Sequence, residues 1–340
     1  MREHSRAGVV TILLTATVVW LGTVGARAGL SFEAVSVEVD MPANHVIEPG
    51  EFPGVAPSWK NISGGTVALT GTASNISGPP GATYGFLDTT ADYGSVANGA
   101  TASCWTTTGH CYVLSISNPP TRPTFHWDIS FLETLSTGQM RTWTLHVGRT
   151  FNDVSPTSSL YPFVETLVHN AITAGCNFMP GWYCATFSVT REQMAIFLLR
   201  SIEGGSYVPP SVPSTFADVP ASSPYSRWIE ELANRGITAG CGTNPARYCP
   251  TEPVLREQMA VFVLRGIEGG SYVPPQPSGQ RYIDVPPSHP FYAFIDQMGY
   301  RGITGGCAAS PPKFCPTAPV TRIQMAAFLV RGFDLELYGL

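Results

Sequence analysis

Hydrophobic and polar positions follow two different periods in the two halves of the chain. Over residues 29–148, short runs alternate between apolar and polar positions and are separated by Gly- and Pro-rich segments. The clearest runs are "GGTVALTGTASNIS", "CYVLSIS", "HWDISFLETL" and "RTWTLHVG". A period of two is typical of strands that bury one face. The pattern therefore predicts an all-β sandwich over residues 29–148.

The last two runs also predict which side chains fill the sandwich. Alternate residues of a strand share one face, so each run places its large apolar side chains together. A sandwich of this kind resembles the immunoglobulin-like domains of envelope proteins, and its sequence indicates no particular activity. The expected core residues are Trp127, Ile129 and Phe131 on one strand and Trp143, Leu145 and Val147 on the next.

From residue 149 onward the apolar positions fall at helical spacing, and the whole pattern occurs three times. The units begin "FNDV", "FADV" and "YIDV" at Phe151, Phe216 and Tyr282, so the periods are 65 and 66 residues. Each unit has a short amphipathic segment, a Gly-rich loop with two cysteines, and a second apolar segment. This order predicts two helices per unit, and the three units must pack together because two helices alone cannot bury their apolar faces.

The start of each second helix carries a capping signal. Thr190 and Thr321 are each followed three residues later by Gln, which predicts a capping box. Leu255 occupies this position in the middle unit, so we expect a cap that is weaker by roughly 1 kcal/mol.

The N-terminus has the layout of a secretory signal. Arg2 and Arg6 precede the apolar run "GVVTILLTATVVWLG", and small residues occupy Ala26 and Ala28, which predicts cleavage after Ala28. No later stretch is apolar for long enough to span a membrane. The predicted organisation is a signal peptide (1–28), a β-sandwich (29–148), repeat 1 (149–203), a linker (204–215), repeat 2 (216–268), a linker (269–281), repeat 3 (282–334) and a tail (335–340).

The repeated motifs resemble the S-layer homology (SLH) domain over about residues 149–334. The family's F-x-D-V opening, G-I-x-x-G turn and T-R-A-E helix start correspond to "FADV", "GITAG" and "LREQ" in repeat 2, with close variants in repeats 1 and 3. The resemblance implies an all-α module of three repeats with pseudo-threefold packing. It also implies attachment to the cell envelope through a peptidoglycan-linked wall polymer, often pyruvylated, held between repeats.

The resemblance also implies the ligand-binding residues. Arginine forms a planar fork that matches a carboxylate, and the first turn of a helix favours an anion. The alternative is that the arginines and aspartates form ion pairs that join the two ends of a repeat. The fourth residue of the T-R-A-E motif is Gln in all three units instead of Glu. One position earlier, repeats 1 and 2 carry Glu192 and Glu257, whereas repeat 3 carries Ile323, so the third groove is expected to differ. The candidate residues are Arg191, Arg256, Arg322, Asp153, Asp218 and Asp284, with Trp182, Trp228 and Tyr248 as candidate sugar-stacking or core aromatics.

The eight cysteines form four local pairs. Spacings of seven and eight residues differ from a redox C-x-x-C motif, and a zinc site would need two further ligands that no unit supplies nearby. In an exported chain we therefore expect disulfides, each stabilising the fold by roughly 2–3 kcal/mol. The expected pairs are Cys104–Cys111, Cys176–Cys184, Cys241–Cys249 and Cys307–Cys315.

Charge and motif searches exclude several classes of function. The chain carries a net charge of −5, with Lys60 and Lys313 as its lysines, which argues against nucleic-acid binding. The histidines show no close ligand spacing, and neither a nucleophile elbow nor a P-loop occurs. We expect no catalytic residue, cofactor or metal. The sequence favours an envelope protein that binds cell-wall polysaccharide or peptidoglycan; the alternative is a structural protein whose repeats contact other envelope proteins in a surface layer.

Overall fold

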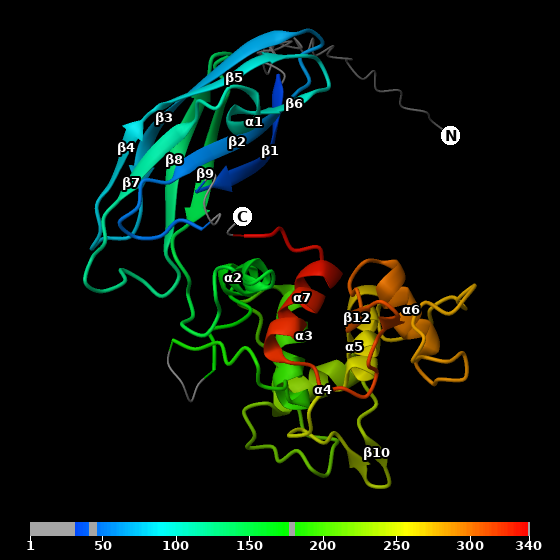
Figure 1. The fold of residues 1–340 in the computed structure, drawn as a ribbon. Coiled ribbons are helices and arrows are strands. Elements are labelled where there is room, and N and C mark those ends of the chain that lie inside the picture. The colour runs from blue at the N-terminus through cyan, green and yellow to red at the C-terminus, as the bar shows by residue number, and fades with distance from the viewer. Residues whose placement is uncertain (1–30, 41–45, 177–180, 339–340) are drawn as a thin grey trace, which may run out of the picture.

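The computed structural model describes residues 31–40, 46–176 and 181–338, and it contains two bodies that meet at the end of the β domain (Figure 1). The predicted signal peptide, residues 1–28, lies outside the described residues. No helix in the described part of the chain is both long and apolar enough to cross a membrane.

The fold is mixed, and the predicted division into an all-β domain followed by an all-α module is wrong. About 26% of the residues form strands in antiparallel sheets and 23% form helices. The β domain contains a short helix, α1 (Cys104–Thr107), and the repeat region contains two-residue strands inside its cysteine loops. Such short strands arise because each loop folds back on itself, and they are too brief to leave a periodic pattern in the sequence.

The β domain consists of two antiparallel sheets. The predicted alternating runs are found in β3 (Val67–Ser77), β7 (Tyr112–Ile116), β8 (Asp128–Leu135) and β9 (Met140–His146). The sheets enclose one core that includes the six predicted residues, from Trp127 to Val147, all of them buried. The first sheet has the order β1 (Phe32–Val39), β2 (Gly54–Asn61), β7 (Tyr112–Ile116) and β4 (Tyr84–Asp88), with β6 (Thr101–Ser103) also paired to β2; the second has the order β5 (Thr90–Val96), β3 (Val67–Ser77), β8 (Asp128–Leu135) and β9 (Met140–His146).

A buried carboxylate links the two sheets at the centre of this core. Glu133 is fully buried on β8, and its oxygens accept four hydrogen bonds from side chains of both sheets. The donors are Trp59 Nε1 at 3.2 Å, Trp143 Nε1 at 2.6 Å, Tyr93 Oη at 2.5 Å and Tyr112 Oη at 2.7 Å. Burial and the neighbouring Glu133 carboxylate raise the pKa of both tyrosines, so they remain donors.

Each repeat contains two helices joined by a cysteine loop. In the second repeat the loop forms the hairpin β10 (Gly242–Thr243) with β11 (Ala246–Arg247), and in the third it forms β12 (Ala308–Ala309) with β13 (Pro312–Lys313). All four predicted disulfides are confirmed. The helices are α2 (Tyr161–His169) and α3 (Arg191–Glu203), α4 (Ser226–Asn234) and α5 (Arg256–Glu268), and α6 (Tyr292–Tyr300) and α7 (Arg322–Gly332).

The residues just before α3, α5 and α7 join the three repeats in a closed cycle. Val189 N–H donates to Val320 O, Val320 N–H to Val254 O, and Val254 N–H to Val189 O, each at 2.9 Å. The helices pack around this cycle in a single core. Capping boxes are present at Thr190 and Thr321, whereas Leu255 offers no side-chain cap, as its sequence predicts.

Replacing Glu133 by Gln tests the buried carboxylate. A Gln side chain replaces one of the two accepting oxygens by an NH2 group, so the two buried donors that face this oxygen would lose their acceptor. We expect Glu133→Gln to lower the free energy of unfolding by about 3 kcal/mol. Urea unfolding followed by tryptophan fluorescence measures this change.

The matched control is Glu33→Gln on β1, where the exposed carboxylate lies 3.9 Å from Lys60. An exposed ion pair of this kind contributes about 0–1 kcal/mol. Equal stability of the two variants would contradict the role assigned to Glu133.

Candidate functional site

The three arginines predicted to bind a ligand are buried and contact the next repeat. Each is 4% exposed, and each donates through Nε to a backbone carbonyl in the cysteine loop of a different unit. Together the three bonds close a second cycle through the repeats. The pairs are Arg191 with Tyr248 O at 2.7 Å, Arg256 with Phe314 O at 2.7 Å, and Arg322 with Tyr183 O at 2.6 Å.

Each of these guanidinium groups also lies over the aromatic ring of its partner. The distance from the arginine Cζ to the ring centroid is 4.8 Å in all three pairs. Burial lowers the pKa of the three arginines, but an arginine pKa starts so high that the groups stay charged. The positive charge is thus satisfied partly by carbonyls and partly by ring faces.

The helix starts themselves are not free for an anion. The first two N–H groups of α7 donate to repeat 1, from Arg322 to Phe187 O at 2.9 Å and from Ile323 to Ala185 O at 3.1 Å. The third, from Gln324, donates to Thr321 Oγ1 at 3.4 Å. Contacts between repeats therefore use the donors that a helix start would offer to a ligand.

The three predicted aspartates fasten the cysteine loop of their own repeat. Asp218 accepts from the backbone N–H groups of Tyr248 and Cys249, both at 2.8 Å, and Asp284 accepts likewise from the third loop. Asp153 accepts from Tyr183 N and Ala185 N. Ion pairs between these aspartates and Arg191, Arg256 or Arg322 were the alternative to ligand binding, and among the described residues they do not form; Asp218 lies 3.9 Å from Arg247. Arginine and aspartate instead hold opposite sides of the same loop residue.

A groove of about 360 Å³ lies beside Arg322, between repeats 1 and 3. Its walls come from the loop closed by Cys176–Cys184, one face of α3, the start of α7 and Tyr225 of repeat 2. Arg322 Nε and Nη2 donate to Tyr183 O and Gly175 O. We call this cavity the inter-repeat groove.

Two groove residues, Arg200 and Tyr225, were not among the residues selected from the sequence. Arg200 ends the motif "FLLR" and lies over the Trp228 ring of the next repeat at 5.4 Å. Arg265 and Arg331 occupy the same position in the other two repeats, so the repeated arginine was a signal in the sequence that could have identified Arg200. Tyr225 has no such signal, because Leu160 and Phe291 stand at its place in the other repeats.

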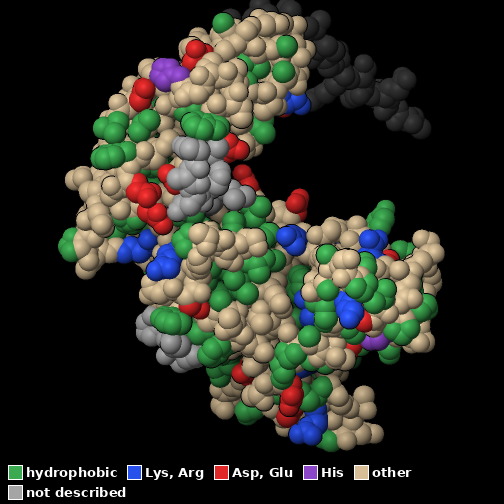
Figure 2. Space-filling model, in the orientation of Figure 1, with side chains coloured by type: hydrophobic (Ala, Val, Ile, Leu, Met, Phe, Trp, Pro, Cys, Tyr) green, Lys and Arg blue, Asp and Glu red, His purple; other side chains and the backbone are tan. Residues whose placement is uncertain are grey.

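The candidate stacking aromatics divide into core and surface. Tyr248 and Trp228 are buried and belong to the core of the repeats, whereas Trp182 is 39% exposed. On the face shown in Figure 2, Lys and Arg side chains are scattered over both bodies rather than gathered in one basic patch.

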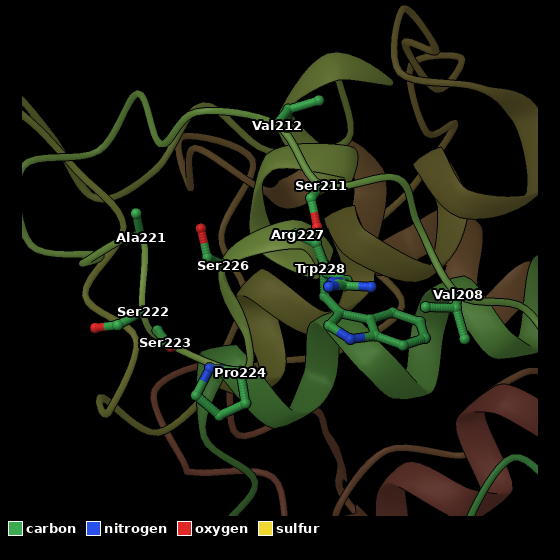
Figure 3. A pocket seen from close by; sticks show the side chains of 10 residues that line it. All are labelled: Val208, Ser211, Val212, Ala221, Ser222, Ser223, Pro224, Ser226, Arg227 and Trp228. Carbon is green, nitrogen blue, oxygen red and sulfur yellow. The ribbon is translucent and has the colours of Figure 1, made fainter.

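A second cavity, of about 420 Å³, lies on repeat 2 (Figure 3). The linker after α3 and the start of α4 form its walls, with Ser211, Ser222, Ser226 and Arg227 as polar lining and Trp228 at its edge. Its lining comes from the linker before repeat 2 and from repeat 2 itself, and it includes no disulfide and none of Arg191, Arg256 and Arg322.

The fold also brings three histidines together around one carboxylate, although their spacing in the sequence gives no motif. The carboxylate oxygens of Asp128 lie 3.2, 3.0 and 3.6 Å from ring nitrogens of His126, His146 and His169, respectively. Burial alone would raise the pKa of Asp128, but these three imidazoles lower it well below its usual range. Burial likewise disfavours charge on His146, but Asp128 and Glu165 raise its pKa.

Comparisons with known proteins assign no family. No protein-family model matches the chain, and no curated protein sequence matches it. A FixG-related protein from Vibrio parahaemolyticus is 11% identical, with a TM-score of 0.21 over 34% of this chain and 94% of that one. The alkylpurine DNA glycosylase AlkC of Pseudomonas fluorescens is 12% identical, with a TM-score of 0.21 over 35% and 31%. A lipoprotein from Bacteroides thetaiotaomicron is 16% identical, with a TM-score of 0.20 over 38% and 85%. Similarities of this size assign neither a fold nor an activity.

The two backbone hydrogen bonds that Asp218 accepts in the cysteine loop predict that stability depends on pH. Partial burial opposes the charged form, but the N–H groups of Tyr248 and Cys249 lower the pKa of Asp218 below 3.8 in the fold. Its contribution is therefore present above the unfolded-state pKa and is lost as the pH falls through the folded-state pKa. We expect Asp218→Asn to reduce the free energy of unfolding by about 1–2 kcal/mol at pH 7, and the difference from the wild type to shrink below about pH 4.

Urea unfolding over a pH series measures this effect. Glu252→Gln, which changes an exposed carboxylate in the same repeat, serves as the control and should track the wild type. A difference between Asp218→Asn and the wild type that stays constant down to pH 2 would contradict the assignment.

Proposed function

We propose that the protein is a non-catalytic cell-envelope protein that binds a cell-wall polymer through its repeats and displays the β domain. The inter-repeat groove is the observation that carries this proposal. It is open to solvent, lies between units that are separated in the sequence, and combines Arg322, Arg200 and Tyr225 around one cavity. The positive charge of the two guanidinium groups and the aromatic hydroxyl suit an acidic sugar, such as a pyruvylated unit of a wall polymer, even though Nε and Nη2 of Arg322 already donate to backbone carbonyls.

The resemblance of the repeat motifs to SLH domains supports the same reading, because that family attaches exported proteins to the envelope. The four disulfides fit a chain that folds in an oxidising compartment. The groove beside Arg322 differs from the corresponding places in the other repeats through Tyr225, so we assign it the principal binding role.

Sedimentation with isolated cell-wall sacculi tests the proposal. Since Arg322 holds two repeats together, its removal would confuse binding with folding, and substitutions on the groove wall are more informative. Ser188→Glu places a carboxylate on the exposed wall of the groove, where it should repel an acidic polymer and reduce binding at least tenfold. Tyr225→Phe removes one hydroxyl and should reduce binding roughly 2- to 10-fold.

Ser222→Glu is the matched control, because it adds the same charge to the second cavity (Figure 3). It should bind as the wild type does. Loss of binding with Ser222→Glu but not with Ser188→Glu would move the site to that cavity. Failure of the wild type to sediment with sacculi would refute wall binding and favour repeats that contact other envelope proteins.

A further inference from the structure

The junction between the β domain and the first repeat contains a cluster of metal-binding side chains. His126 and Asp128 lie at the start of β8, His146 ends β9, and His169 ends α2. The C-terminal segment runs past the same place, where Tyr338 packs on His169. We call His126, Asp128 and His169 the junction triad.

The spacing within the triad is that of ligands around one ion. His126 Nε2 lies 3.2 Å from Asp128 Oδ1 and 3.3 Å from His169 Nδ1, and His169 Nδ1 lies 3.6 Å from Asp128 Oδ2. Zinc binds imidazole nitrogen and carboxylate oxygen at about 2.0–2.2 Å in a tetrahedron, which places neighbouring ligand atoms about 3.3–3.6 Å apart. The two imidazole nitrogens thus lie at this separation from each other, and each lies at a similar separation from one oxygen of Asp128: His126 Nε2 from Oδ1 and His169 Nδ1 from Oδ2. One ligand atom from each of the three residues is close enough to the others to share an ion.

Hydrogen bonds alone cannot pair all of these nitrogen and oxygen atoms at once. His126 Nε2 faces both the carboxylate and the second imidazole nitrogen, and one proton on it can be donated in only one main direction. A divalent cation accepts a lone pair from all three groups at once. It also balances the negative charge that Asp128 contributes at the junction.

The surroundings hold the triad in place and leave it open on one side. His146 is almost wholly buried, and its Nδ1 lies 3.0 Å from Asp128 Oδ1, as a group that orients a metal-binding carboxylate would. The Tyr338 ring stacks on His169 with centroids 3.6 Å apart and an angle of 12°. His126, Asp128 and His169 have side chains that are 19%, 26% and 39% exposed, so an ion can reach them from solvent.

A neighbouring set, His126, His146 and Glu165, is also close enough to hold a metal. Glu165, however, already accepts from Thr150 N and Oγ1 at 2.8 and 2.6 Å. Glu230 accepts from Thr215 in the same way in repeat 2, so this carboxylate has a structural role that repeats 1 and 2 share. The junction triad has no such counterpart, because Asn234 and Tyr300 end the helices equivalent to α2.

We propose that the junction triad binds one divalent transition-metal ion of the zinc class, with water in the fourth position. His126 and Asp128 come from the β domain and His169 from the first repeat, so the ion joins the two bodies. The ligand set of two imidazoles and one carboxylate favours zinc, cobalt or nickel over calcium or magnesium, which prefer oxygen ligands. The proposal is independent of polymer binding by the repeats.

Titration of the oxidised mature chain, freed of metal by a chelator and carrying no polyhistidine tag, tests the proposal. Cobalt(II) serves as the probe, because its visible absorption is intense when it is tetrahedral, and zinc should displace it. We expect one ion per chain at micromolar concentration or below, and a rise in the thermal unfolding temperature when zinc is added. Absence of cobalt binding by the wild type would overturn the proposal without any variant.

Two variants locate the ion. His169→Asn introduces the residue that repeat 2 carries at the same helix position, so the helix should tolerate it. His126→Gln removes a ligand on the β domain. Each should weaken cobalt binding at least 10-fold and abolish the zinc-dependent rise in unfolding temperature.

His110→Gln is the matched control. His110 Nε2 lies 3.2 Å from Asp88 Oδ2 on the exposed surface of the β domain, which is a histidine–aspartate pair without a third ligand. This variant should bind cobalt as the wild type does. Binding that survives both triad substitutions, or that is lost in His110→Gln, would overturn the assignment.

Discussion

The packing of the three repeats depends on three buried arginine side chains, each of which contacts a neighbouring repeat. Each helix-start arginine extends out of its own repeat and donates to a carbonyl of another, while it covers the aromatic ring of the same residue. Burying a guanidinium costs free energy that its hydrogen bonds and ring contacts must offset, so the Nε bond to the carbonyl ties the position of the loop to that of the arginine. The aspartate of the receiving repeat holds the other side of that loop.

Much of this organisation could be predicted from the sequence, because the signals were periodic or repeated. Alternation located β3, β7, β8 and β9, and tandem similarity located the helices and the cysteine pairs. The all-α description of the repeats failed because strands of two residues have no period to detect. Their pairing follows from loop closure, which is a property of the folded loop.

The candidate site was predictable in its residue types but not in its partners. The repeated arginine and aspartate were found by motif, yet a repeat in the sequence gives no sign that Arg191 contacts the loop of the following unit. Tyr225 was missed because its position varies among the repeats. His126, His146 and His169 lie too far apart in the sequence for a spacing rule, and they meet only because the end of the sandwich faces α2.

The cyclic arrangement also sets an order of assembly. Arg191 is 57 residues from the carbonyl it contacts and Arg256 is 58, but Arg322 is 139 residues from Tyr183. The first two contacts join repeats that follow each other in the chain, whereas the last joins the third repeat to the first. Since contacts between distant residues form more slowly than local ones, we expect the contact between Arg322 and the loop of repeat 1 to form last. The inter-repeat groove is completed by that same contact, because Arg322 forms part of its wall, so the cavity exists only when the ring has closed.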